Sequence, residues 1–255
     1  MPGPCAVLLD LAARHATGAL LRDSGTLYLA DGAVVHAESP AAPGVGTLLT
    51  VGGRLTDDHW RGAIDRAGAL RQVGRFLVDS GRLSCGELEI CHLSALFDAS
   101  YFVLAAARGG PTRFRPGAQH WFGRLRPITA GAVERESRRR TALLNGLWPH
   151  PQVDTTPVVR RTAPHSPAPS RRQRAVLGLA DGVRTPSDIA RLLGRPAFHT
   201  LVDIRRLAAA GHIDTPALAP PSPPVTPLVP WSADAAAVPD IALLRRIRDA
   251  LEARL

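Results

Sequence analysis

The stretch TGALLRDSGTLYLADGAVVHAES, residues 17–39, decides the fold of the first part of the chain. It contains three short runs rich in apolar residues, at 19–23, 26–30 and 33–37. The second and third runs are separated by Asp31-Gly32, and an Asp-Gly pair between two such runs is a strong signal for a two-residue hairpin. The sequence therefore predicts a small antiparallel β-meander.

Helical patterns flank this meander on both sides. Residues 6–16 place apolar side chains on one face of a short helix. From 44 to 107 the pattern is helical again, and Thr56 is predicted to cap one of these helices. Residues 108–128 are expected to supply one or two edge strands, and a further helix is predicted at about 129–146. Residues 1–146 are thus predicted to form one α+β domain.

Composition divides the later part of the chain. Residues 147–168 are rich in Pro and polar residues, which predicts a flexible linker. Three short helices are predicted in 169–215, with a tight Gly turn between the second and third, which is the helix-turn-helix pattern. A disordered tether rich in Pro and Ala is predicted at 216–238, and an amphipathic helix at 239–255.

The segment RTPSDIARLLG, residues 184–194, carries the clearest helix start. Thr185 is placed to cap the helix, Pro186 occupies its first position, and Asp188 is the acid of a capping box. The prolines after 215 leave little chain for the second strand of a wing. The expected fold class is α+β: a small antiparallel meander with helices, linked to a mainly α winged-helix domain and a C-terminal amphipathic helix.

Residues 17–39 resemble the core hairpins of the PATAN domain, a bacterial family formerly of unknown function. The matching positions are Gly18, Gly25, Asp31, Gly32 and His36. The resemblance runs to about residue 107, and GAVERESRRRTALL resembles the helix that often closes such domains. The string LADGVRTPSDIARLLGR resembles the winged helix that follows PATAN modules in related proteins. The resemblance implies a regulatory or protein-interaction module without enzymatic activity, commonly found beside receiver or DNA-binding domains.

The basic charge lies in one part of the chain. The formal net charge is +9, and every one of the 31 basic residues is arginine, which is typical of a GC-rich genome. Residues 1–107 hold 8 arginines against 11 acidic residues, whereas 108–215 hold 19 against 7. Within 160–215 there are 10 arginines against 4 acidic residues. A surface of this charge fits either a polyanion or an acidic protein.

The third helix of the predicted winged-helix domain is expected to enter the major groove of double-stranded DNA. Arg195, His199, Asp203 and Arg206 share one stripe of this helix. Asp203 opposes binding, because a carboxylate near phosphates is repelled unless it accepts a hydrogen bond from a cytosine. We expect the DNA contacts to come from Arg171, Arg172, Arg174, Arg184, Thr185, Ser187, Arg195, His199, Thr200 and Arg206.

The sequence favours a DNA-binding transcriptional regulator from bacteria, whose first domain responds to a partner or signal. The alternative is a signalling adaptor that does not bind DNA and uses its PATAN-like domain, winged helix and last helix for protein contacts. A receiver domain or a small-GTPase switch system is the partner class that the resemblance implies. The last helix either folds back or docks on a partner through Ile241, Leu244, Ile247, Leu251 and Leu255.

The sequence contains no motif for catalysis or metal binding. It has no P-loop, GxGxxG, HExxH or GxSxG pattern, and its three cysteines form no CxxC pair. His36, beside Glu38, is expected to be a packed or solvated residue. We therefore predict no enzymatic activity, no cofactor and no metal.

The expected location is the cytoplasm. The N-terminal segment lacks the positive region of a signal peptide, and no purely apolar run approaches the roughly 20 residues of a membrane span. Three cysteines in a chain of 255 residues fit a reducing compartment. No contact with a membrane is expected, and the sequence does not predict an oligomeric state.

Overall fold

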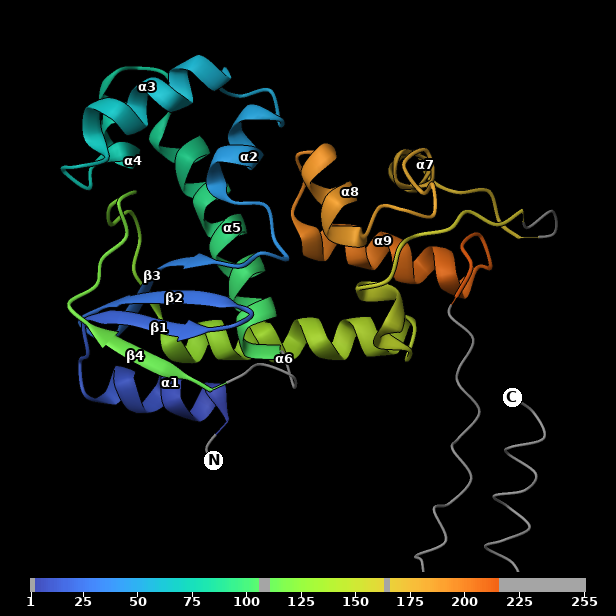
Figure 1. Ribbon diagram of the computed structural model, residues 1–255, viewed down its shortest axis with the longest axis horizontal. Coiled ribbons are helices and arrows are strands. Elements are labelled where there is room, and N and C mark those ends of the chain that lie inside the picture. Colours follow the sequence, from blue (N-terminus) through green and yellow to red (C-terminus); the bar gives the residue numbers. More distant parts are fainter. Residues whose placement is uncertain (1–2, 106–110, 163–165, 216–255) are drawn as a thin grey trace, which may run out of the picture. The chain divides into compact units, whose positions relative to one another are not determined.

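The computed structural model describes residues 3–105, 111–162 and 166–215 (Figure 1). The described residues all belong to one compact unit. The predicted tether at 216–238 and the predicted helix at 239–255, with its proposed partner-binding stripe, lie outside the described residues.

The first part contains a five-stranded antiparallel sheet with the strand order β4-β1-β2-β3-β5. The strands are β1 (Gly18–Arg22), β2 (Gly25–Ala30), β3 (Ala33–Glu38), β4 (Arg113–Pro116) and β5 (Ile128–Thr129). The meander predicted from residues 17–39 is confirmed, with each strand within about one residue of its expected bounds. The segment 108–128 contributes edge strand β4, and β5 begins at its last residue, so the expectation of one or two edge strands is also confirmed.

The β2–β3 turn uses backbone angles that the Asp-Gly pair makes accessible. Asp31 has φ 49° and Gly32 has φ 75°, both in the left-handed region. The Asp31 amide donates to Oγ1 of Thr17 at 2.9 Å. A Cβ at Gly32 would lie 2.5 Å from the carbonyl oxygen of Ala12, so this glycine also permits the first helix to approach the turn.

The helices of this part are α1 (Pro4–Ala13), α2 (Val45–Thr50), α3 (Asp57–Ala67), α4 (Val73–Asp79), α5 (Cys85–Ala105) and α6 (Ala130–Leu147). Helices α5 and α6 contact the strands of this sheet, whereas α2, α3 and α4 pack with one another and with α5 in a second core cluster. Thr56 caps α3 as predicted, because its side chain accepts from the His59 amide. The long helix α5 runs beside the sheet (Figure 1). Its Leu96 and Val103 are fully buried in one core cluster with Leu20 and Leu27 of the strands.

By length and composition, α5 is apolar enough to cross a membrane, although no such segment was expected. About 61% of its most apolar window is buried inside the protein. His92 and Asp98, on the same helix, are 0% exposed. Polar side chains buried against protein are typical of the core helix of a folded domain.

The three helices predicted in 169–215 are present as α7 (Arg171–Leu177), α8 (Pro186–Leu192) and α9 (Ala197–Ala209). The capping box at α8 is confirmed: the Asp188 amide donates to Oγ1 of Thr185 at 3.3 Å, and the Thr185 amide donates to Oδ2 of Asp188 at 3.0 Å. Ile213 forms an isolated antiparallel bridge with Arg160, which precedes α7. Within the described residues, Ile213 therefore pairs with an earlier segment and not with a second wing strand.

The segment 147–168, expected to be a flexible linker, packs against these helices over its described residues. It contains the 3-10 helix η1 (Pro151–Asp154). Val153 and Val158 are each 3% exposed and belong to the core cluster of the three helices. The Val158 amide donates to the carbonyl oxygen of Arg184 at 2.9 Å. The composition indicated a linker because prolines dominate it, whereas its few valines supply the contacts that hold it.

Candidate functional site

Helix α9, the predicted DNA-reading helix, lies between two apolar clusters. On one side Ile204 and Leu207 pack with residues of α7 and α8. On the other side, residues of α9 pack with side chains of α5 and α6, in a cluster formed by Tyr101, Leu144, Phe198, Leu201 and Val202. Ten of its 13 residues are buried. Little of the helix surface is left to enter a DNA groove.

A buried carboxylate from the first part of the chain holds the start of α9. Asp98 of α5 is 0% exposed. Its Oδ2 accepts from the Ala197 amide at 2.5 Å, and its Oδ1 accepts from the Phe198 amide at 2.9 Å. The first amides of a helix lack partners within the helix, and a negative charge there is favourable. Asp98 thus acts as a cap donated by another element.

Arg140 of α6 completes this contact. Its Nη1 donates to Oδ1 of Asp98 at 3.1 Å, and its guanidinium lies 4.5 Å from the centre of the Phe198 ring. Burial raises the pKa of Asp98, while the hydrogen bonds from the two amides and from Arg140 act in the opposite direction. Three helices, α5, α6 and α9, therefore meet at one buried polar contact.

Helix α8 also faces the first part of the chain. Oγ of Ser187 donates to the carbonyl oxygen of Ala41 at 2.9 Å, and Nη2 of Arg191 donates to that of Pro40. Arg184 forms an ion pair with Asp181 at 2.8 Å. The residues predicted to contact DNA phosphates from α8 are therefore engaged in contacts within the protein.

The structure brings only some of the ten predicted DNA contacts to an open surface. Thr200 is 1% exposed. Arg195 is partly buried, and its Nη1 has no hydrogen-bond partner among the described residues. The exposed members are those of the first turn of α7 and two on α9: Arg171, Arg172, Arg174, His199 and Arg206.

Asp203 does not present a free charge to this surface. It is 4% exposed, and its Oδ2 accepts from Nη2 of Arg172 at 3.1 Å. Burial, followed by the charge of Arg172, lowers the pKa of the neighbouring His199. The open part of α9 is a narrow strip that carries His199 and Arg206, beside the Arg172–Asp203 pair.

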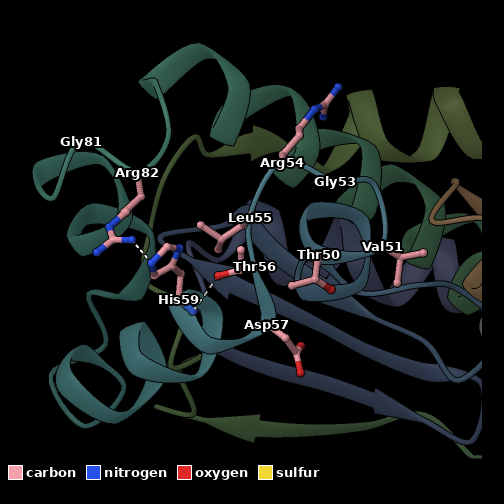
Figure 2. A pocket seen from close by; sticks show the side chains of 10 residues that line it. All are labelled: Thr50, Val51, Gly53, Arg54, Leu55, Thr56, Asp57, His59, Gly81 and Arg82. Carbon is pink, nitrogen blue, oxygen red and sulfur yellow. Dashed lines mark hydrogen bonds between the residues drawn. The ribbon is translucent and has the colours of Figure 1, made fainter.

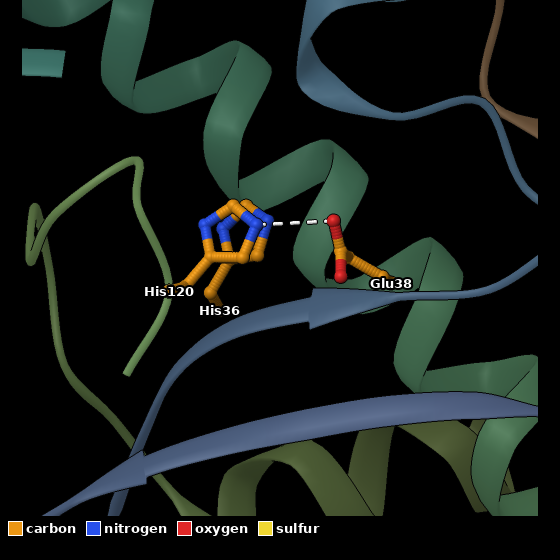
Figure 3. Close-up of side chains that lie close together, drawn as sticks. All are labelled: His36, Glu38 and His120. Atoms are coloured by element: carbon orange, nitrogen blue, oxygen red, sulfur yellow. Dashed lines mark hydrogen bonds and ion pairs between the residues drawn. The ribbon is translucent and has the colours of Figure 1, made fainter. Parts of the chain in front are cut away.

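A cluster of buried histidines lies on the sheet (Figure 3). His36 and Glu38 are two residues apart on β3 and so share a face, His120 follows β4, and His92 comes from α5. Nε2 of His120 lies 3.0 Å from Oε1 of Glu38, and Nδ1 of His36 lies 3.1 Å from Nε2 of His92. The rings of His36 and His120 stack with centres 3.7 Å apart. His36 is packed, one of the two expected alternatives.

The hydrogen bonds fix where the proton of His120 lies. The Phe122 amide donates to its Nδ1 at 3.2 Å, so Nε2 carries the proton and donates to Glu38. That bond is the main reason why the pKa of Glu38 is lowered, and the Tyr28 hydroxyl also donates to this carboxylate, at 3.1 Å. Burial lowers the pKa of His92 to about 4.

Three of these side chains are close enough together to be considered as metal ligands. Ligand atoms of His36, Glu38 and His120 lie within 4.8 Å of one another. A metal ion lies close to the plane of each imidazole ring that binds it. The rings of His36 and His120 are stacked at 14° to each other, so no point near their nitrogens lies in both ring planes. The Nε2 proton of His120 would also have to leave. The observed arrangement favours a hydrogen-bonded side-chain cluster over a metal site.

A hollow of about 720 Å³ lies beside α2 and α3 (Figure 2). Arg82 donates to Nε2 of His59, and Asp57 forms an ion pair with Arg61. Arg54 points away from Asp57 (Figure 2), and its Nη1 donates to Sγ of Cys91 at 2.5 Å. The charged groups here have partners within the protein, and no polar set converges on one point.

The residues that shape these sites, above all Asp98, Arg140, His92 and His120, were not predicted from the sequence. One signal could have found Asp98: it is the only charged residue between Glu89 and the end of α5. A lone carboxylate in an apolar helix indicates a buried partner. Nothing local in the sequence indicated which partner.

Comparisons with family models, with curated proteins and with solved structures each found no match. The resemblance to a PATAN domain followed by a winged helix therefore stays a prediction from the sequence.

Proposed function

We propose that this chain is a regulatory adaptor without enzymatic activity, which acts by binding a protein partner. One observation carries the proposal: the helix that would read DNA is held at its start by buried Asp98 and buried along most of its length. This supports the adaptor alternative over the DNA-binding regulator that the sequence favoured.

The energy of freeing α9 supports the same choice. Separating α9 from α5 and α6 would expose Phe198, Leu201 and Val202. Burying each such side chain stabilises by about 1.5–3 kcal/mol, so opening costs on the order of 5 kcal/mol. That leaves roughly 1 molecule in 10⁴ open, and the apparent affinity falls by the same factor. A DNA site bound at about 10 nM by free α9 would then be bound at about 100 µM, which is the non-specific level.

The chemistry of the exposed surface suggests an acidic partner. Five arginines of the later part are exposed and have no ion pair within the described residues: Arg160, Arg161, Arg171, Arg174 and Arg206. Guanidinium groups pair with carboxylates in a two-pronged geometry. An acidic protein surface can use these groups without separating α9 from the rest of the protein.

DNA binding by a released form is the second candidate. It is favoured by the Arg172–Asp203 pair, which removes the repulsion that Asp203 was expected to cause. In that case a signal would have to separate α9 from Asp98 first.

In vitro selection from a random duplex library tests the two functions against each other. We expect the full chain to enrich no sequence, and its weak DNA binding to fall steeply with salt. An enriched motif that is lost in Arg206→Ala but kept in Arg113→Ala would contradict the adaptor. Arg113 is the matched control because it is an exposed arginine on β4, outside the three helices.

Site-specific photocrosslinking in the native cell tests the partner directly. A photoreactive residue in place of Arg206 should capture a protein, whereas the same residue in place of Arg113 should not capture that protein. Crosslinking of position 206 to nucleic acid would refute the adaptor and support the DNA-binding candidate.

A further inference from the structure

A pocket of about 300 Å³ lies where β2 meets the turn between α3 and α4 and the loop that follows β4. Leu29, Val35 and Leu70 supply part of an apolar wall. The polar lining consists of Tyr28, Arg71, Gln72, Gln119, His120 and Arg124. Among these described lining residues there are two guanidinium groups and no carboxylate. The lining of the pocket therefore carries two positive formal charges and is partly apolar.

The residue that carries one of these guanidinium groups, Arg71, has an unfavourable backbone conformation. Arg71 has φ 56°, a region that residues with a side chain rarely adopt. In the turn that follows α3, the Arg71 amide donates to the carbonyl oxygen of Gly68 at 3.0 Å, and Gly or Asn is the usual left-handed residue after a helix. Strained residues cluster at binding sites, where the surrounding structure maintains them. An arginine here carries a conformational cost that a glycine would not.

The opposite wall is built to approach Arg71 closely. Gly123 has φ 93°, and a Cβ there would lie 2.5 Å from the carbonyl oxygen of Arg71. Nη1 of Arg71 donates to Oε1 of Gln119 at 3.0 Å. A neutral amide therefore orients this guanidinium and leaves its charge uncompensated within the pocket.

The carboxylate of Glu38 contacts the pocket wall from outside. It accepts from the Tyr28 hydroxyl and from Nε2 of His120, both of which line the pocket, but it is not itself a lining residue. These two bonds fix the orientation of the Tyr28 and His120 rings. The wall is thus held in place before any ligand binds.

We propose that this pocket binds a compact organic oxyanion, in which a phosphate or carboxylate meets Arg71 and Arg124 and an apolar group lies against Leu70 and Val35. Guanidinium groups recognise both oxyanions through paired hydrogen bonds. A volume of about 300 Å³ is at the small end for ligand pockets, which restricts the ligand to a small molecule. This site is independent of the proposed adaptor surface.

Phenyl phosphate is the probe, titrated into the ¹⁵N-labelled full chain at constant ionic strength. We expect saturable shifts of the Gln72, Gly123 and Arg124 amides. Phenol tests whether the charge is needed, and inorganic phosphate tests whether the apolar wall contributes. Phenyl phosphate should bind more tightly than either.

Three variants separate binding from folding. Arg71→Asn removes the guanidinium but places a residue that tolerates positive φ, so the variant should keep or raise the melting temperature while it binds about tenfold more weakly. Arg124→Gln should weaken binding by a similar factor. Arg113→Gln, an exposed arginine outside the pocket lining, should bind as the parent does.

Three results would overturn the proposal. They are shifts that do not saturate, equal binding of phenol and phenyl phosphate, and unchanged affinity in both Arg71→Asn and Arg124→Gln.

Discussion

Replacing Asp98 should loosen the contact between α9 and the helices α5 and α6. Asp98→Ala removes the acceptor for the amides of Ala197 and Phe198 and for Nη1 of Arg140. Arg140 keeps one partner, because its Nε donates to Oε1 of Glu136 at 2.8 Å.

The expected loss follows from these contacts. Removing one partner of a buried ion pair costs about 3–5 kcal/mol of stability. Asp98→Ala should cost about 3 kcal/mol, at the lower end of this range, because Arg140 keeps its hydrogen bond with Glu136. Asp98→Asn keeps one oxygen acceptor but turns an NH₂ donor toward a backbone amide and removes the charge that pairs with Arg140, so about 2–3 kcal/mol should be lost. If the loss falls on the docking of α9, a value of 3 kcal/mol raises the open population about a hundredfold.

Urea unfolding measures the total loss, and hydrogen exchange shows where it falls. The amides of Ala197 and Phe198 should exchange faster in Asp98→Ala. Amides of the β2–β3 hairpin should keep their protection once the change in global stability is subtracted. A loss below about 1 kcal/mol, or unchanged exchange at these two amides, would refute the role given to Asp98.

Three further predictions concern other parts of the fold. The pKa of His92 is about 4, well below that of an unfolded histidine, so the unfolded chain binds more protons between pH 6.5 and 4. His92 should therefore lower the free energy of unfolding by up to about 3 kcal/mol across that window, and His36, whose pKa is also lowered, should add to this fall. Urea unfolding at each pH should show a smaller total fall in His92→Gln. Arg205→Ala should cost about 3–5 kcal/mol in chemical unfolding, because Arg205 is 2% exposed and pairs with Asp154 at 2.5 Å; a loss under about 1 kcal/mol would contradict this. Gly32→Ala should lower stability by about 1–3 kcal/mol in thermal unfolding, since its Cβ would meet the Ala12 carbonyl; an unchanged melting temperature would show that the turn adapts.

Local patterns in the sequence predicted the elements well. The Asp31-Gly32 turn and the Thr185 capping box depend on backbone preferences of neighbouring residues, so both could be derived without tertiary information. The segment 147–168 was harder to predict, because its prolines dominate the composition while two valines determine its packing.

The candidate sites were less predictable from the sequence. The stripe of α9 that was expected to face DNA includes Asp203, and the pairing of this residue with Arg172 depends on how α7 crosses α9. Thr200 was assigned to the DNA contacts, but it is buried. A helical pattern shows which residues share a face, and gives no information about which element covers that face.

By itself, the sequence determined the meander, the helix starts and the concentration of arginine in the later part of the chain. Only the tertiary structure decided that α9 is covered on both sides, that Asp98 caps it, and that Arg71 and Arg124 line one pocket. The physical reason is the range of the interactions: turn and cap preferences act over a few residues, whereas Asp98 and Ala197 are separated by 99 positions and meet only when the chain has folded.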